Sequence, residues 1–236
     1  MKVFDTYADY ESVKDGLEYP TVSYVKDSDA IYYMMQAELY EFVDLGLPSG
    51  LKWSAWNVGA TKPEESGLYF AWGETQGYTG ITDEKQFTWV DYTLCDGTSS
   101  NMLKYNITDG LTTLELVDDA AYATDSTCRI PTKDELVELK ANTTSEWVAN
   151  YNGTGVAGRI FNSKVNGNSI FIPAAGSCRE GSNTNTLYGS AGCLWSSTRT
   201  SLATSEAWYC DFGSDSIDVY GMFGYCFQDH SIRPVK

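Results

Sequence analysis

Short apolar or alternating stretches recur along the chain and predict β-strands that bury one face. The clearest of these stretches lie at 42–45, 51–56, 67–73, 207–212 and 217–220. Many short strands of this kind favour a sheet-rich domain whose connections are irregular.

A tight hairpin is predicted near the middle of the chain. Residues 159–161 and 170–173 predict its two strands, and Asn166-Gly167 lies between them. Asn-Gly supplies the positive φ angles that such a turn requires. In contrast, residues 74–110 are polar and rich in Gly, Thr and Ser, so they predict long loops.

Two helices are predicted, at 118–122 and at 131–139. The second has the stronger start signal, because Thr132 is placed as the N-cap and Glu135 follows three residues later to complete a capping box. Two short helices together with many short antiparallel strands predict an α+β fold with long irregular loops.

Residues 1–39 are predicted to form an appendage that is separate from a main domain at 40–236. Within the appendage, 21–25 and 30–33 are the strands of a hairpin around the polar turn 26–29. An isolated hairpin is only marginally stable in water, so we expect it to pack on the main domain or on another chain.

Acidic residues dominate the charge of the chain. Asp and Glu total 32 against 16 Lys and Arg, which gives a formal net charge of -16. A nucleic-acid-binding protein needs a basic face to displace phosphate counterions, so nucleic acid is excluded as a partner. Anionic membrane surfaces are disfavoured for the same reason.

No targeting or membrane segment is predicted. The first residues carry acids throughout and lack the apolar run of a signal peptide. No apolar run approaches the ~18 residues of a transmembrane helix, so no membrane insertion is expected. We expect the chain to be made in the cytoplasm and to leave a cell, where it does so, by a route such as lysis.

Few residues could support catalysis or metal binding. The single histidine is His230, and none of the six cysteines forms a C-x-x-C pair. Because zinc sites and catalytic triads depend on such residues, we expect no metal, no cofactor and no enzyme activity. Free thiols are the default without a secretion signal, but Cys193, Cys210 and Cys226 leave a disulfide or metal set open.

An ordered set of short motifs runs through residues 40–236. The motifs lie at 42–50, 52–53, 57–60, 69–74, 118–121, 128–132, 172–176, 194–197 and 232–235. Together they resemble a paralogous domain common in gut bacteria and their phages, a group that includes the variable proteins of diversity-generating retroelements. The chain departs from the family pattern at Cys128, where an aromatic residue is more frequent.

This resemblance implies a C-type-lectin-like fold in which codons near the C-terminus are rewritten to vary a binding surface. The variable region would be about 188–230, and Trp195, Ser196, Ser197, Ile232, Arg233 and Pro234 would be fixed scaffold residues. Several members are receptor-binding proteins of phage tails. We therefore expect a hypervariable display protein on a virion, with a protein or glycan on a cell surface as its ligand. Residues 1–39 lie outside the match, and homo-oligomer formation or virion attachment stays open for them.

The candidate ligand-binding residues come from a C-terminal stretch that mixes aromatic residues and acids. Alternation places Trp208, Cys210 and Phe212 on one face of a strand and Tyr209 and Asp211 on the other. Tyrosine and tryptophan suit recognition because they offer a large contact area with few rotatable bonds. The broad exposed surface that we predict comprises Tyr209, Asp211, Asp218, Tyr220, Phe223, Tyr225, Phe227 and Asp229.

Two other functions stay open at this point. A bacterial surface adhesin of the same fold would need an export signal. An oxidase similar to the formylglycine-generating enzymes would need a reactive cysteine pair, and no pair can be identified. The runs by which lectins of this fold bind sugars through calcium, such as Glu-Pro-Asn, are absent from the chain.

Overall fold

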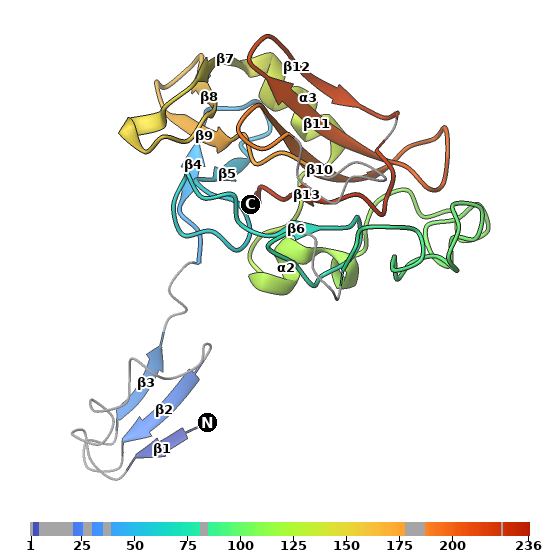
Figure 1. Ribbon diagram of the computed structural model, residues 1–236. Helices are drawn as coiled ribbons and strands as arrows, with labels where there is room; N and C mark the ends of the chain where they lie inside the picture. Colours follow the sequence, from blue (N-terminus) through green and yellow to red (C-terminus); the bar gives the residue numbers. More distant parts are fainter. Residues whose placement is uncertain are drawn as a thin grey trace. The chain divides into compact units, whose positions relative to one another are not determined.

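The computed structural model describes residues 2–4, 21–25, 30–34, 39–80, 85–177, 187–222 and 224–236 (Figure 1). The chain divides into two compact units, Met1–Leu39 and Tyr40–Lys236. Strands in the first unit are β1 (Lys2–Phe4), β2 (Thr21–Val25) and β3 (Ala30–Met34). The hairpin predicted from the sequence is present as the antiparallel pair β2–β3, and β1, which was not predicted, pairs with β2 in parallel.

The second unit has the α+β composition that was predicted. Among its described residues there are two α-helices, α2 (Ala120–Thr124) and α3 (Lys133–Asn142). Its strands are β4 (Phe42–Asp44), β5 (Lys52–Ser54), β6 (Tyr69–Phe70), β7 (Thr143–Val148), β8 (Gly158–Ser163), β9 (Ser169–Pro173), β10 (Ala191–Arg199), β11 (Ala207–Gly213), β12 (Ile217–Tyr220) and β13 (His230–Ser231). No helix in the described part of the chain is long and apolar enough to cross a membrane.

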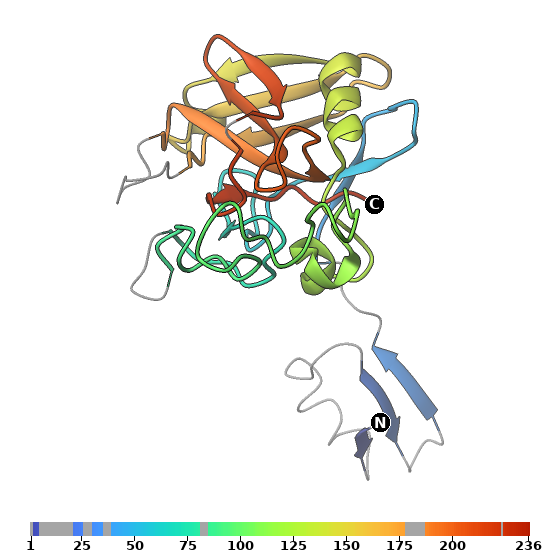
Figure 2. The same cartoon turned by 90° about the vertical axis from the view of Figure 1, so that its right-hand side faces the viewer.

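A five-stranded sheet in the order β12-β11-β10-β13-β6 organises this unit. Its neighbours pair antiparallel except β10 and β13, which are parallel. The pairing inserts the last strand of the chain, β13, between β10 and β6. Two smaller sheets, β7-β8-β9 and β4-β5, accompany it, and α3 packs against β7, β10, β11 and β12 (Figure 2).

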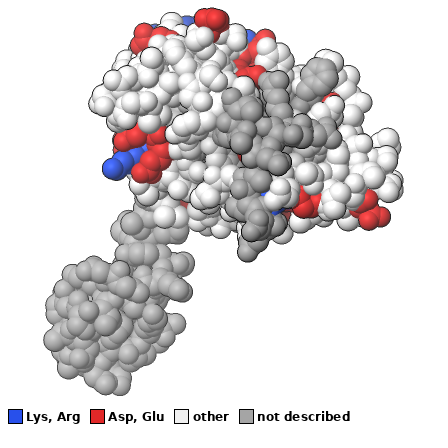
Figure 3. All heavy atoms as spheres, in the orientation of Figure 1, with Lys and Arg blue, Asp and Glu red and all other residues white. Residues whose placement is uncertain are grey.

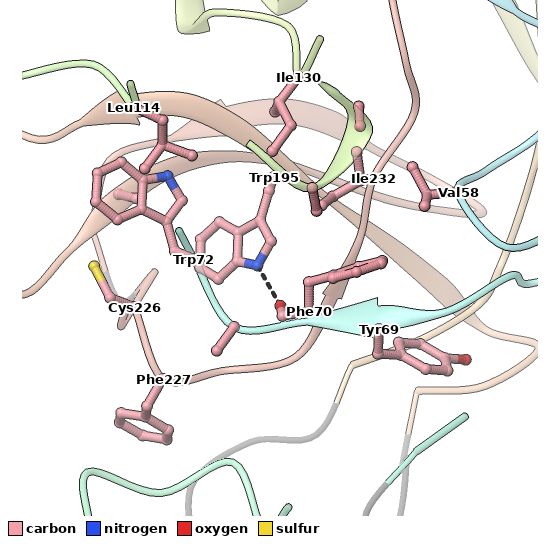
Figure 4. Close-up of a cluster of buried hydrophobic side chains, with 14 of the residues drawn as sticks. Val58, Tyr69, Phe70, Trp72, Leu114, Ile130, Trp195, Cys226, Phe227 and Ile232 are labelled. Atoms are coloured by element: carbon pink, nitrogen blue, oxygen red, sulfur yellow. Dashed lines mark hydrogen bonds between the residues drawn. The ribbon is translucent and has the colours of Figure 1, made fainter. Parts of the chain in front are cut away.

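The two faces of β10 bury different hydrophobic clusters. Leu194 belongs to the α3-side cluster, which also contains Leu45, Leu47, Trp53, Leu136, Leu139, Phe161, Ile170, Ile172, Cys210, Phe212 and Val235. Trp195 belongs to the opposite cluster, where its indole donates a hydrogen bond of 2.8 Å to the carbonyl oxygen of Phe70 (Figure 4). Adjacent strand residues point to opposite faces, so β10 is buried on both sides.

The start of α3 agrees with the sequence prediction. Thr132 Oγ1 accepts a hydrogen bond from the backbone N–H of Glu135, and the Glu135 carboxylate accepts one from the backbone N–H of Thr132. Arg129 also donates to Glu135 at 2.6 Å. Burial acts to raise the pKa of Glu135, but the bonds from Arg129 and Thr132 outweigh it and lower that pKa.

Thr132→Ala is expected to lower the free energy of unfolding by about 1 kcal/mol, because the N–H of Glu135 loses its acceptor. The change should appear as a lower urea midpoint with an unchanged slope. The same substitution at the exposed Thr108 is the control. Equal effects at the two threonines would show that the cap contributes nothing.

Residues 74–80 and 85–110 contain no helix or strand, as predicted. This long loop is nevertheless ordered by side chains. Lys85 and Glu74, both buried, form an ion pair of 2.7 Å, and Tyr92 donates a hydrogen bond of 2.7 Å to the carbonyl oxygen of Trp72. The loop therefore presents fixed side chains next to the sheet.

Candidate functional site

One face of β10, β11 and β12 carries a row of aromatic side chains in register. Trp195 lies opposite Tyr209, and Tyr209 lies opposite Tyr220. The ring centroids are 6.2 Å apart in the first pair and 6.0 Å apart in the second. Trp195 is buried, Tyr209 is half-buried and Tyr220 is 41% exposed, so the row runs from the core to the surface.

Two predicted acids continue this face. Asp211 lies opposite Asp218 in the antiparallel pair β11–β12, where two like charges repel. Lys140 of α3 reaches Asp218 with an ion pair of 2.9 Å and lowers the pKa of that carboxyl. Lys140 thus offsets part of the repulsion between the two carboxylates.

The segment after β12 returns along β11 and extends the face. The backbone N–H of Ala207 donates to the carbonyl oxygen of Gly224, and the Tyr209 hydroxyl donates to the carbonyl oxygen of Met222 at 3.5 Å. Met222 is 54% exposed and Tyr225 is half-buried. We use the term β11–β12 face for the accessible residues Tyr209, Asp211, Asp218, Tyr220, Met222 and Tyr225.

Phe227 does not belong to this surface, which corrects the prediction. It is 1% exposed, its ring stacks on Tyr225 at 5.8 Å, and the ring of Trp89 meets it at 4.7 Å. Trp89 comes from the long loop, and this contact was not predictable because no local period links the two segments. The buried ring of Phe227 and the ring of Trp89 both pack against the ring of Tyr225.

Asp229 is also wrongly predicted as exposed, since it is fully buried. It lies beside His230, whose ring is 4.0 Å from the Trp195 ring and 5.0 Å from the Tyr209 ring. His230 therefore packs beneath the aromatic row. Of the other predictions, Phe223 lies outside the described residues, and the remaining five reach the surface on the β11–β12 face.

Ser177, Asp229 and His230 come together in the buried interior, a grouping that sequence reasoning missed. Ser177 Oγ lies 3.0 Å from His230 Nδ1 and 3.4 Å from Asp229 Oδ1. In a catalytic triad the carboxylate orients the imidazole, and the hydroxyl contacts the other ring nitrogen. Here the serine lies between the carboxylate and the imidazole, and all three residues are buried. The arrangement suits a structural hydrogen-bond network.

Five cysteines lie in the described part of the chain, and all are buried: Cys95, Cys128, Cys193, Cys210 and Cys226. Burial raises the pKa of Cys128 and of Cys210 to about 12. A thiol must lose its proton to act as a nucleophile or metal ligand, so these thiols are poorly suited to either role. The described residues contain no group of three or more His, Cys, Asp or Glu side chains that could hold a metal ion.

Two of the motifs that carry the family resemblance form buried framework. Leu194–Ser197 lies in β10, and Ile232, Arg233 and Pro234 are buried beside it. The strands that carry the β11–β12 face pair with this framework, because β11 pairs with β10 and β12 pairs with β11. Comparison of the chain with protein-family models, with curated proteins and with solved structures found no match.

Proposed function

We propose that this protein is a ligand- or receptor-binding display protein with a C-type-lectin-like fold, and that it binds its ligand through the β11–β12 face. The observation that carries the proposal is the aromatic row, in which Tyr209 and Tyr220 reach the surface from strands whose other side is packed in the core. Binding residues held on strands keep their geometry better than residues on loops.

The chemistry of the face suits a broad interface. Tyrosine supplies contact area at a low cost in conformational entropy, and interface hot spots are enriched in it. Asp211 and Asp218 would repel anionic partners and so narrow the choice of ligand. Figure 3 shows acidic residues in small separate groups on the side it draws, and uncharged residues form most of the surface of the described residues there. A neutral or basic patch on a cell-surface protein or glycan fits these properties.

The proposal includes variation of this face by a diversity-generating retroelement and display on a phage virion, with Met1–Leu39 as the unit that attaches or oligomerises. Positions in the variable region then differ in which amino-acid substitutions they tolerate. A Cβ atom added at Gly224 would lie 2.4 Å from the carbonyl oxygen of Ala207, so Gly224 must stay glycine. Tyr220 and Met222 are exposed and free to change.

The test is a graft of new side chains at Tyr209, Asp211, Asp218, Tyr220 and Tyr225. Parent and graft are screened against one panel of cell-surface proteins and glycans. We expect the graft to fold and to bind a different set, because hot spots lost from an interface cost about 2 kcal/mol or more each. A control graft changes exposed residues remote from this face, including Val165 and Thr144.

The control should keep the parent's binding set. If the folded graft on the β11–β12 face also keeps that set, the ligand binds elsewhere and the proposal fails. Stability measured for both grafts separates a loss of binding from a loss of folding.

A further inference from the structure

A pocket of about 370 Å³ opens among three segments of the second unit. The segments are 73–78, 85–94 and 117–118, and none of them contributes to the β11–β12 face. The lining residues are Gly73, Glu74, Thr75, Gln76, Tyr78, Lys85, Asp91, Thr93, Leu94, Val117 and Asp118. A volume of this size falls in the range of small-molecule sites.

The floor of the pocket is charged and held rigidly. Glu74 and Lys85, both more than nine-tenths buried, pair at 2.7 Å. Glu74 also accepts hydrogen bonds from the N–H and hydroxyl of Thr93, at 2.8 and 2.9 Å, and Lys85 donates to the carbonyl oxygen of Asp91 at 2.9 Å. Burying an ion pair adds little to stability, because desolvation offsets the attraction, so stability alone does not explain this one.

The walls combine an excess of negative charge with apolar surface. Three lining carboxylates, Glu74, Asp91 and Asp118, face one lining ammonium, Lys85. The lining therefore carries an excess of two negative charges. Lys104, which is not part of the lining, forms an ion pair with Asp118, but it also pairs with Glu115, so these two additional charges cancel and the excess is unchanged. Leu94 and Val117 supply the apolar wall. Burial acts to raise the pKa of Asp91, yet backbone N–H donors lower it, which keeps that carboxylate ionised.

We infer that this pocket binds a small organic cation of the alkylammonium class, with its charged head toward the carboxylates and its stem along Leu94 and Val117. An anionic ligand would meet net repulsion there. A bare metal ion does not fit, because the described residues contain no group of three or more His, Cys, Asp or Glu side chains that could hold one. The inference is independent of the function proposed for the β11–β12 face.

The experiment uses the full chain and three probes of matched shape: butylamine, butanol and butyrate. Binding is followed by ligand-observed NMR, with a hexose as a fourth probe. We expect butylamine alone to bind, and its affinity to fall as salt is added, because salt screens the attraction. Equal binding of butanol, or stronger binding of butyrate or the hexose, would overturn the inference.

Two matched variants locate the site. Val117, which is 72% exposed, lines the pocket, and Ile107, which is 87% exposed, does not. Val117→Lys should raise the Kd for butylamine about tenfold by adding a positive charge at the pocket, whereas Ile107→Lys should leave it unchanged. Both side chains are exposed, so both variants should fold. Equal Kd values for the two variants would place butylamine outside this pocket and overturn the inference.

Discussion

Replacing Arg233 by alanine is expected to lower the free energy of unfolding by about 3–5 kcal/mol. The guanidinium is fully buried and forms no ion pair with the described residues. It donates instead to Asn57 Oδ1 at 2.9 Å and to the carbonyl oxygens of Ser54 and Phe171, both at 3.0 Å. Burial lowers its pKa, since low polarity disfavours the charge. Alanine would leave a cavity and three acceptors without their donor.

Urea unfolding followed by circular dichroism measures this effect, and two further variants interpret it. Arg233→Met keeps most of the volume and removes the donors, so its cost separates the hydrogen bonds from the cavity. Lys52→Ala removes a cationic side chain that is exposed on β5 and should change stability by less than about 0.5 kcal/mol. A loss below about 1 kcal/mol for Arg233→Ala would mean that the hydrogen bonds of Arg233 do not hold β5 and β9 to the C-terminus.

Elements with local signals were predictable from the sequence. The capping box of Thr132 and Glu135 depends on residues three apart, and it marks the start of α3 correctly. The Asn166-Gly167 turn depends on adjacent residues, and Gly167 has the expected positive φ of 78°. The strand β7, whose residues Thr143–Val148 begin directly after α3, was missed because it carries no turn signal at its start.

Features that depend on distant segments were not predictable. The period of β11 correctly placed Cys210 and Phe212 in the core and Tyr209 toward the accessible side. After Tyr220 the aromatic residues follow no period, so nothing local showed that Phe227 would be buried against Trp89. The same holds for the pair of Glu74 and Lys85, which is made by two loop segments without helical or strand spacing.

The division between buried framework and accessible face also bears on the proposed variation of this face, because side chains there could change without loss of the fold. Along the row from β10 to β12, burial falls from Trp195 through Tyr209 to Tyr220. The energy of folding is concentrated at the buried end, since stability follows the apolar area removed from water. Contact area for a ligand is available at the exposed end. Truncation of a side chain at the buried end of the row should therefore lower stability strongly, whereas truncation at the exposed end should lower it little.

Trp195→Ala is accordingly expected to lower the free energy of unfolding by about 3–5 kcal/mol, as for other truncations of large core side chains. The indole is 1% exposed, and the carbonyl oxygen of Phe70 would lose its hydrogen-bond donor. Tyr220→Ala, at the other end of the row, should cost less than about 1 kcal/mol, because that ring is 41% exposed. Both values come from urea unfolding monitored by circular dichroism. Comparable losses at the two positions would show that Tyr220 is part of the core, and the face would then lack the exposed aromatic centre that the proposed function requires.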